Sequence, residues 1–457
     1  MLDRVLDTID SRKDQSLALL KDFLRIPSVS TKPENANDVK HCAEWLADQI
    51  RQTGLSATVY PTDGHPIVVA KNSHQPGRPT VLMYGHYDVQ PPEPLDLWTT
   101  PAFEPDVRKD ENGFDAVYAR GAVDDKGQVW CHVEAIRAFA GNLPVNVTML
   151  IEGEEECGSG HLDAFVEQHA DLLKADVCVI SDTNQFARGL PAITYGLRGL
   201  CYMEVFVTGP DHDLHSGMYG GAVPNPANVL CQLIASLHDT DGRVTIPGFY
   251  DDVVPLSQEE RDQWKKLPLT EEQFAAGVGI PFGNGEVGFT SIERKWARPT
   301  LDVNGLTSGY QGVGAKTVIA SKASAKVSMR LVPKQDPAKI RAAFEKHLRD
   351  RCPKNVKIEF VGHGLSPGVL TPVESPAVQL AREALEIGFG VKPTIMREGG
   401  SIPVVGLIKK VLGIDTLLVG FGLPDDRVHS PNEKFDLDAL HKGTRTAALL
   451  YAKLASL

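Results

Sequence analysis

The sequence lacks any apolar run of the roughly 18 residues that a membrane span requires. Its first stretch, MLDRVLDTIDSRKDQ, is charged throughout and has no apolar segment of the kind found in secretory signals. It also has no stripe of Lys and Arg, and its formal charge of −12 disfavours a polyanionic partner, because nucleic-acid binding uses clustered basic residues. We therefore expect neither a membrane nor a nucleic acid as a partner.

Paired cysteines are also missing. The seven cysteines are an odd number, are spread along the chain and include no C-x-x-C pair. This usage favours reduced thiols over a disulfide framework and predicts a cytoplasmic protein.

The length and the order of elements predict an α/β protein with two domains. At 457 residues the chain exceeds the size at which one hydrophobic core keeps growing. The strand-like runs PIVVA, TVLMY, VNVTMLIE and DVCVISD alternate with helical patterns, as over 126–139, which predicts a mostly parallel sheet.

The pattern changes after about residue 192. The strands LCYMEVFVTG and SAKVSMRLV and the helices 226–237 and 337–348 indicate a smaller α+β unit. The stretch 247–304 shows no clear period and is interpreted as an ordered loop of uncertain shape. We predict a catalytic domain in two parts, 1–192 and 365–457, interrupted by an inserted domain at 193–364.

Polar residues follow the predicted strands. His86 and Asp88 follow TVLMY, Asp182 follows VCVIS, and His429 follows TLLVGFG. Ligands of open α/β sheets lie beyond the carboxyl ends of the strands, so these residues are expected to converge. Carboxylates packed together need a cation, and imidazole with carboxylate suits zinc, with manganese as the alternative.

The motifs GHYDVQP, RGAVDDKG, EGEEECGSG, DLHSGMYGG, MREGGSIPV and VHSPNEK resemble those of the M20 family of metallopeptidases. Within that family the chain is most similar to cytosolic nonspecific dipeptidases and carnosinase-type dipeptidases. The resemblance covers nearly the whole chain. It implies a zinc-binding catalytic domain with an inserted α+β lid that forms a homodimer.

The resemblance further implies two divalent metal ions bridged by Asp124. His86 and Asp182 would complete one site, and Glu156 and His429 the other. Counting back from Gly158 in EGEEECGS makes Glu155 the general base and Glu154 a spacer. Asp88 would orient the His86 ring. Asp125 would matter for the main-chain conformation and not for metal ligation, because the peptide bond that precedes it tends to be cis in the family.

The resemblance also implies substrate-binding residues. His215 of one subunit would stabilise the oxyanion in the other, and Arg330 would bind the substrate carboxylate. Gly400 and Ser401 would contact the same carboxylate, with His363 as a further candidate. From the residues alone, a surface salt bridge for Arg330, a loop histidine for His363 and a helix N-cap for Ser401 stay open.

Three functions follow from these observations. The first is metal-dependent hydrolysis of dipeptides. The second is removal of an acyl group from an N-acyl-amino acid, as in acetylornithine deacetylases and succinyl-diaminopimelate desuccinylases, which would use the same metals and base. The third is a noncatalytic scaffold that binds metal or peptide.

Overall fold

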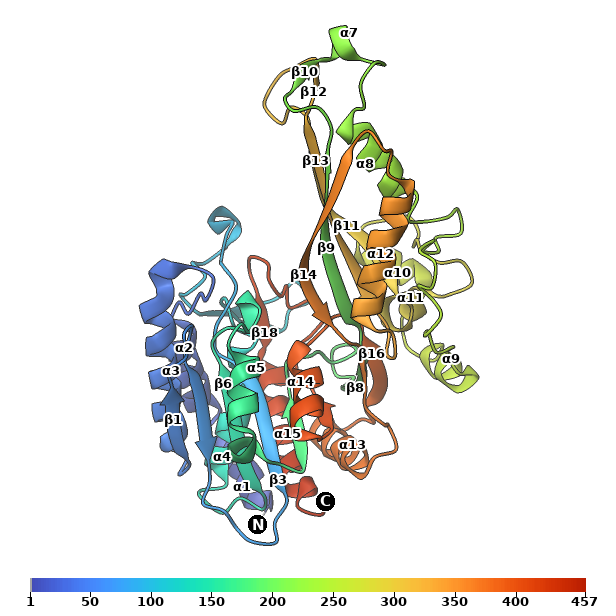
Figure 1. Ribbon diagram of the computed structural model, residues 1–457. Coiled ribbons are helices and arrows are strands. Elements are labelled where there is room, and N and C mark those ends of the chain that lie inside the picture. Colours follow the sequence, from blue (N-terminus) through green and yellow to red (C-terminus); the bar gives the residue numbers. More distant parts are fainter. Residues whose placement is uncertain (1) are drawn as a thin grey trace. The chain divides into compact units, whose positions relative to one another are not determined.

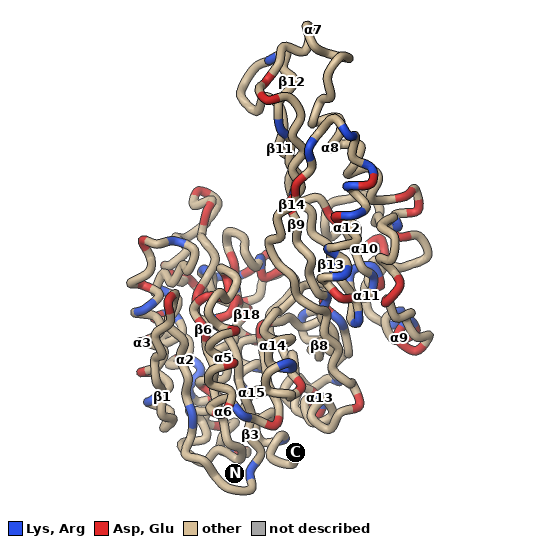
Figure 2. Tube along the Cα trace, viewed as in Figure 1, with Lys and Arg blue, Asp and Glu red and all other residues tan. Residues whose placement is uncertain are grey.

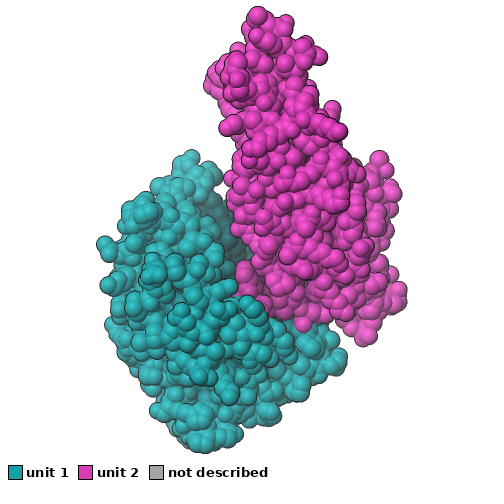
Figure 3. Space-filling view, in the orientation of Figure 1, with its two compact units in different colours: residues 1–195, 371–396, 407–457 teal, residues 196–370, 397–406 magenta. Residues whose placement is uncertain are grey.

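The computed structural model describes residues 2–457 and separates them into two compact units (Figure 3). Unit 1 comprises Met1–Tyr195, Thr371–Met396 and Leu407–Leu457, and unit 2 comprises Gly196–Leu370 and Arg397–Gly406. Residues 397–406 thus return to unit 2 after the chain has already re-entered unit 1. No pattern along the sequence indicates this short return.

The largest sheet is parallel at its centre, which confirms the predicted α/β class (Figure 1). Its nine strands include the path β1-β2-β6-β3-β7-β17-β8-β15, and β16 pairs with β8. The pairs β6–β3, β3–β7 and β7–β17 are parallel, whereas β1–β2, β2–β6, β17–β8 and β8–β15 are antiparallel. The strands are β1 (Ser56–Tyr60), β2 (Ile67–Lys71), β3 (Thr80–His86), β6 (Asn146–Glu152), β7 (Val177–Ile180), β8 (Ala192–Leu197), β15 (Val369–Leu370), β16 (Thr394–Glu398) and β17 (Thr416–Leu418).

Helices cover this sheet and enclose the core of unit 1. β6 is buried along its whole length, because a strand inside the sheet is covered on both faces by helices. Asp436 caps α15 by accepting a hydrogen bond from Ala439 N, and α15 packs against α1, α4 and α13. Within residues 2–457 no helix is both long and apolar enough to span a bilayer. The helices are α1 (Leu2–Ser11), α2 (Lys13–Leu24), α3 (Ala36–Arg51), α4 (Lys126–Ala138), α5 (Leu162–Gln168), α6 (Ala170–Leu173), α13 (Pro376–Phe389) and α15 (Leu437–Leu454). A further helix, α14 (Pro403–Leu412), begins in unit 2 and continues into unit 1.

Acidic residues gather at one end of this sheet. Figure 2 shows Asp and Glu positions grouped around the labels β6 and β18. A small three-stranded sheet in the order β18-β5-β4 belongs to the same unit. It consists of β4 (Asp106–Lys109), β5 (Asp115–Tyr118) and β18 (Lys434–Asp436).

Unit 2 is built on a four-stranded antiparallel sheet in the order β11-β13-β9-β14. Burial alternates along β9, so that every second side chain joins the apolar core with α8 and α12. The strands are β9 (Gly199–Thr208), β11 (Thr300–Ser308), β13 (Lys322–Leu331) and β14 (Lys357–Ser366), and the helices are α8 (Pro226–Ala235) and α12 (Pro337–Arg351). Two short strands, β10 (Leu214–His215) and β12 (Val318–Ile319), pair beside α7 (Ser216–Tyr219).

The stretch 247–304 is not a loop throughout but contains three short helices. They are α9 (Gln258–Trp264), α10 (Glu271–Gly277) and α11 (Ser291–Ala297), each of seven residues. Seven residues make two turns, too few for a hydrophobic period to stand out. Each helix begins with a capping box, from Ser257, Thr270 and Thr290, and this signal was available in the sequence.

Candidate metal centre

Parallel strands bring the first polar groups to one edge of the unit 1 sheet. β3 ends at His86, Glu155 and Glu156 lie in the turn after β6, and Asp182 follows β7. Because β6, β3 and β7 are parallel, their carboxyl ends lie at the same edge. Asp124 comes from the loop before α4 and completes this set.

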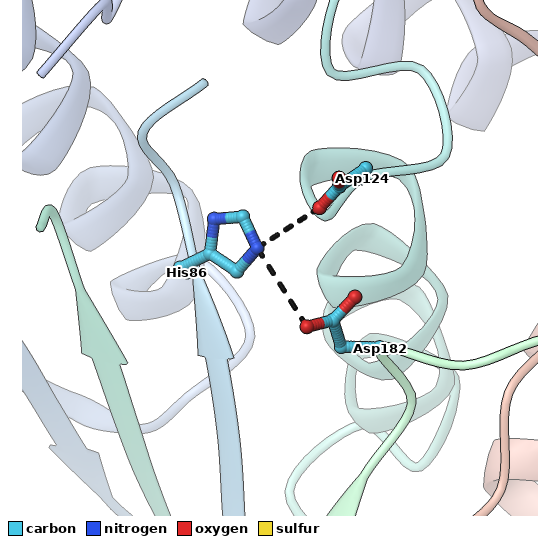
Figure 4. Close-up of side chains that lie close together, drawn as sticks. All are labelled: His86, Asp124 and Asp182. Atoms are coloured by element: carbon cyan, nitrogen blue, oxygen red, sulfur yellow. Dashed lines mark hydrogen bonds and ion pairs between the residues drawn. The ribbon is translucent and has the colours of Figure 1, made fainter. Parts of the chain in front are cut away.

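His86, Asp124 and Asp182 form the first group of possible metal ligands, and Figure 4 shows their side chains converging. Nε2 of His86 lies 3.1 Å from Oδ1 of Asp124 and 3.9 Å from Oδ2 of Asp182. One donor atom from each residue lies within 4.8 Å of the others. One imidazole and two carboxylates can therefore face a single ion.

Asp124, Glu156 and His429 form the second group. Nε2 of His429 lies 2.9 Å from Oδ2 of Asp124 and 3.3 Å from Oε2 of Glu156. Asp124 therefore belongs to both groups and directs Oδ1 toward His86 and Oδ2 toward His429. The side-chain amide of Gln90 donates a hydrogen bond of 2.7 Å to Oε2 of Glu156 and holds that carboxylate in place.

Added positive charge would stabilise the ionised carboxylates of the cluster. Burial raises the pKa of Asp182 to about 7, and the negative charge of Asp124 adds to this effect. Burial also acts to raise the pKa of Asp124, but hydrogen bonds with His429 and His86 outweigh it and keep that pKa below its usual value. Among residues 2–457 no Lys or Arg forms an ion pair with these carboxylates. The donor set therefore fits two divalent cations that share Asp124.

The sequence profile of the peptidase family M20/M25/M40 matches residues 82–453, a range that contains every residue of both groups. The chain belongs to this peptidase family. The predicted resemblance is confirmed, and the protein is a metallopeptidase of the M20 family.

Three similar proteins are informative about this M20 peptidase. It is 33% identical to the Cys-Gly metallodipeptidase DUG1 of Candida albicans, over 97% of this chain and 96% of the relative. It is 32% identical to the human Beta-Ala-His dipeptidase, over 100% of this chain and 93% of the relative. The crystal structure of the M20 family metallo-carboxypeptidase Sso-CP2 from Sulfolobus solfataricus superposes with a TM-score of 0.87 at 33% identity, covering 97% of this chain and 99% of that one.

Glu155 lies beside the two groups of the M20 centre but belongs to neither. Burial raises the pKa of its carboxyl to about 8, and the negative charges of Asp182 and Glu156 add to this rise. A carboxyl that gains and loses a proton near neutral pH suits general acid–base chemistry.

Asp88 contacts the His86 ring and also anchors the turn after β6. Nδ1 of His86 lies 3.1 Å from the main-chain oxygen of Asp88 and 3.4 Å from its Oδ1. The Asp88 carboxylate accepts hydrogen bonds from the main-chain N–H groups of Glu155, at 3.3 Å, and Glu156, at 3.0 Å. One side chain thus sets the positions of a ligand from β3 and of the turn that carries Glu155 and Glu156.

Glu154, expected to be a spacer, has a structural contact of its own. Its carboxylate accepts hydrogen bonds from His65 N at 3.0 Å and from His161 N at 3.2 Å, and lies 2.7 Å from Nδ1 of His161. Its side chain therefore points to neighbouring loops and lies outside both ligand groups. Asp125 follows a cis peptide bond, and its Oδ2 accepts a hydrogen bond from His86 N at 3.2 Å.

The predicted substrate residues lie in unit 2. Nη1 of Arg330 donates to Oγ of Ser401 at 2.9 Å, and the Ser401 hydroxyl donates to the main-chain oxygen of Arg198 at 2.5 Å. The Ser401 hydroxyl thus bonds to a main-chain oxygen and caps no helix, and Arg330 forms no salt bridge among the described residues. Gly400, which precedes Ser401 in the loop, has open space where a side chain would be.

The two unit 2 histidines have different surroundings. Nε2 of His363 lies 3.0 Å from Oε2 of Glu204. His215 is exposed, and its Nδ1 accepts a hydrogen bond from Gly217 N at 3.0 Å. A neutral His215 ring therefore carries its proton on Nε2, which leaves that N–H free to donate.

Two residues of the metal centre were missed from the sequence. Gln90 holds Glu156, and Glu433 accepts hydrogen bonds from the loop of Asp124. Both stand inside motifs that were recognised, GHYDVQP and VHSPNEK, but the motifs do not show which distant groups these two side chains contact. Their roles arise from contacts between distant segments.

Proposed function

We propose that the protein hydrolyses the peptide bond of dipeptides at a dinuclear metal centre. The observation that carries this proposal is the pair of ligand groups sharing Asp124, with the Glu155 carboxyl beside them and outside both groups. Support comes from relatives named as a Cys-Gly metallodipeptidase and a Beta-Ala-His dipeptidase, each similar over more than nine-tenths of both chains.

The ligand assignment follows the two groups. His86 and Asp182 would hold one ion, Glu156 and His429 would hold the other, and Asp124 would contribute to both. Zinc suits this mixture of imidazole and carboxylate, and manganese is the alternative because it accepts oxygen ligands. When bound, the ions polarise the scissile carbonyl and lower the pKa of water. Elemental analysis of the purified protein distinguishes the two metals.

Glu155 acts as the general base. Its carboxylate accepts the proton of the attacking water and then donates it to the nitrogen of the departing amine. Asp88 supports both parts of the centre, because it contacts the His86 ring and fixes the turn of Glu155. The hydrogen bonds of Glu154 leave it no part in this proton transfer.

Arg330 binds the carboxylate of the substrate. Its guanidinium is partly buried yet has no acidic partner within hydrogen-bond distance among the described residues, so an anionic ligand would compensate its charge. The Ser401 hydroxyl donates its hydrogen bond to the main-chain oxygen of Arg198, so toward Arg330 it acts as an acceptor that orients the guanidinium. We propose that the main chain at Gly400, which has open space beside it, and the ring of His363 also contact the substrate.

A substrate panel tests the function. We expect turnover of simple dipeptides, no turnover of N-acetyl or N-succinyl amino acids, and at least about tenfold lower kcat/KM for a dipeptide amide, which lacks the carboxylate bound by Arg330. Addition of Zn²⁺ or Mn²⁺ to metal-stripped protein should restore activity. Turnover of acylated amino acids alone would instead establish the deacylase, and no hydrolysis by metal-loaded protein would establish a scaffold.

We further propose that the inserted domain at 193–364 is a lid that forms a homodimer, and that the protein is cytoplasmic. The seven cysteines are all free, which suits a reducing compartment. His215, exposed and with Nε2–H free to donate, completes the active site of the partner subunit by stabilising the oxyanion.

Mixing two inactive variants tests this shared site. In a dimer of Glu155→Gln and His215→Ala subunits, both lesions fall on one site and the other site is intact. Random reassortment makes half of the dimers mixed, so roughly a quarter of wild-type activity should return for a closed two-fold dimer. No recovery in subunits shown by mass spectrometry to have exchanged would mean that His215 acts elsewhere.

A further inference from the structure

Glu433 is a fully buried carboxylate whose two oxygens are both occupied by the loop that leads to Asp124. Its Oε2 accepts hydrogen bonds from Nη1 of Arg120 at 2.8 Å and from Gly121 N at 3.0 Å. Its Oε1 accepts hydrogen bonds from Val123 N at 3.0 Å and from Asp124 N at 3.2 Å. One side chain therefore sets the main-chain path of residues 120–124.

The main chain of Glu433 strengthens this attachment. Ala119 N donates to the main-chain oxygen of Glu433 at 3.1 Å, and the next residue, Lys434, begins the pairing of β18 with β5. Nη2 of Arg120 donates to the main-chain oxygen of Pro91 at 3.2 Å, in the segment after His86. The Arg120–Glu433 pair thus joins three loops of the metal centre.

His429 lies four residues before Glu433 in the same loop and faces the same aspartate, with Nε2 2.9 Å from Oδ2 of Asp124. The main chain has a φ of 61° at His429 and 61° at Asn432. Residues other than glycine rarely adopt this conformation, and surrounding contacts must hold it. The side chain of Asn432 donates to Leu97 O at 2.7 Å, so the loop is fixed between His429 and Glu433.

We infer that Glu433 is a positioning residue that fixes the bridging Asp124 relative to His429, so that the two metal ions bind together. This inference rests on the proposed ligand set. Buried main-chain N–H groups need acceptors, and an amide side chain in place of Glu433 would offer one oxygen where the carboxylate offers two. In the Glu433→Gln variant the 120–124 loop would lose part of its attachment, and both ions would lose a ligand held in the right place.

Metal titration of the full-length Glu433→Gln variant tests the inference. The variant is stripped with chelator and titrated with Zn²⁺ against a competing chelator, and with Co²⁺ while the visible absorption of bound cobalt is recorded. We expect the affinity for both ions to fall about 10- to 100-fold. Glu433→Asp, which keeps the charge but cannot reach both sides of the loop, should show the same paired loss.

Glu286→Gln is the matched control. Glu286 is also a buried carboxylate, and it holds Arg298 by hydrogen bonds of 2.7 and 2.8 Å, but it belongs to unit 2, whereas every proposed metal ligand belongs to unit 1. Its replacement should lower the unfolding temperature without changing metal affinity. Wild-type affinity for both ions in the Glu433 variants, or an equal loss in Glu286→Gln, would overturn the inference. Because the readout is metal binding, a failed dipeptide assay would leave this result standing.

Discussion

Replacing Glu155 with glutamine is expected to lower kcat for dipeptides by at least about 10²-fold while two metal ions stay bound. The amide keeps the shape of the side chain but can no longer accept the proton of water. Glu155 lies outside both ligand groups, so its loss should leave metal binding intact. Steady-state kinetics and elemental analysis of the same sample measure the two properties.

Glu154→Gln is the control for this prediction. Its hydrogen bonds to His65 N and His161 tie loops together, and an amide oxygen can still accept from one of them. We expect nearly wild-type turnover. An inactive Glu154→Gln beside an active Glu155→Gln would show that the general base had been placed one residue too late in EGEEECGS.

Asp124→Ala is expected to remove both metal ions and to abolish activity. The Asp124 carboxylate turns Oδ1 toward His86 and Oδ2 toward His429, so its loss takes a ligand from each group. His86→Ala removes a ligand from the first group alone and should empty mainly one site. Elemental analysis after gel filtration should therefore find fewer than one ion in the first variant and about one in the second.

Two tightly bound ions in Asp124→Ala would show that the bridging assignment is wrong. Thermal unfolding of the metal-free wild type provides the reference, because removing a buried carboxylate also changes the stability of the apoprotein. The assignment of Asp124 to both sites is supported only if Asp124→Ala loses more metal than another variant that has a similar unfolding temperature.

Several parts of this centre could be predicted because they depend on local pattern. An apolar run such as TVLMY forms a buried strand, and strands alternating with helices lie parallel with their carboxyl ends at one edge. His86 and Asp182 had to lie near one another once β3 and β7 were neighbours. The C-terminal helix Leu437–Leu454 also rests on local pattern, because its apolar period is long and Asp436 caps it.

Other parts have only a weak local pattern or none at all. The three helices of 257–297 are too short for a period, and their capping boxes were the only signal. The hydrogen bonds of Glu154 with His65 and those of Gln90 with Glu156 join segments far apart in the chain.

By itself, the sequence determined the α/β class, the family, and the residue types that gather at the strand ends, since these follow from hydrophobic period and from motifs within short segments. Only the tertiary structure decided which donor groups each carboxylate contacts. Asp124 faces both histidines, Asp88 anchors a turn, and Glu433 fixes a loop more than 300 residues away along the chain. The physical reason is that a carboxylate's role depends on which donors surround it, and folding brings those donors from distant segments.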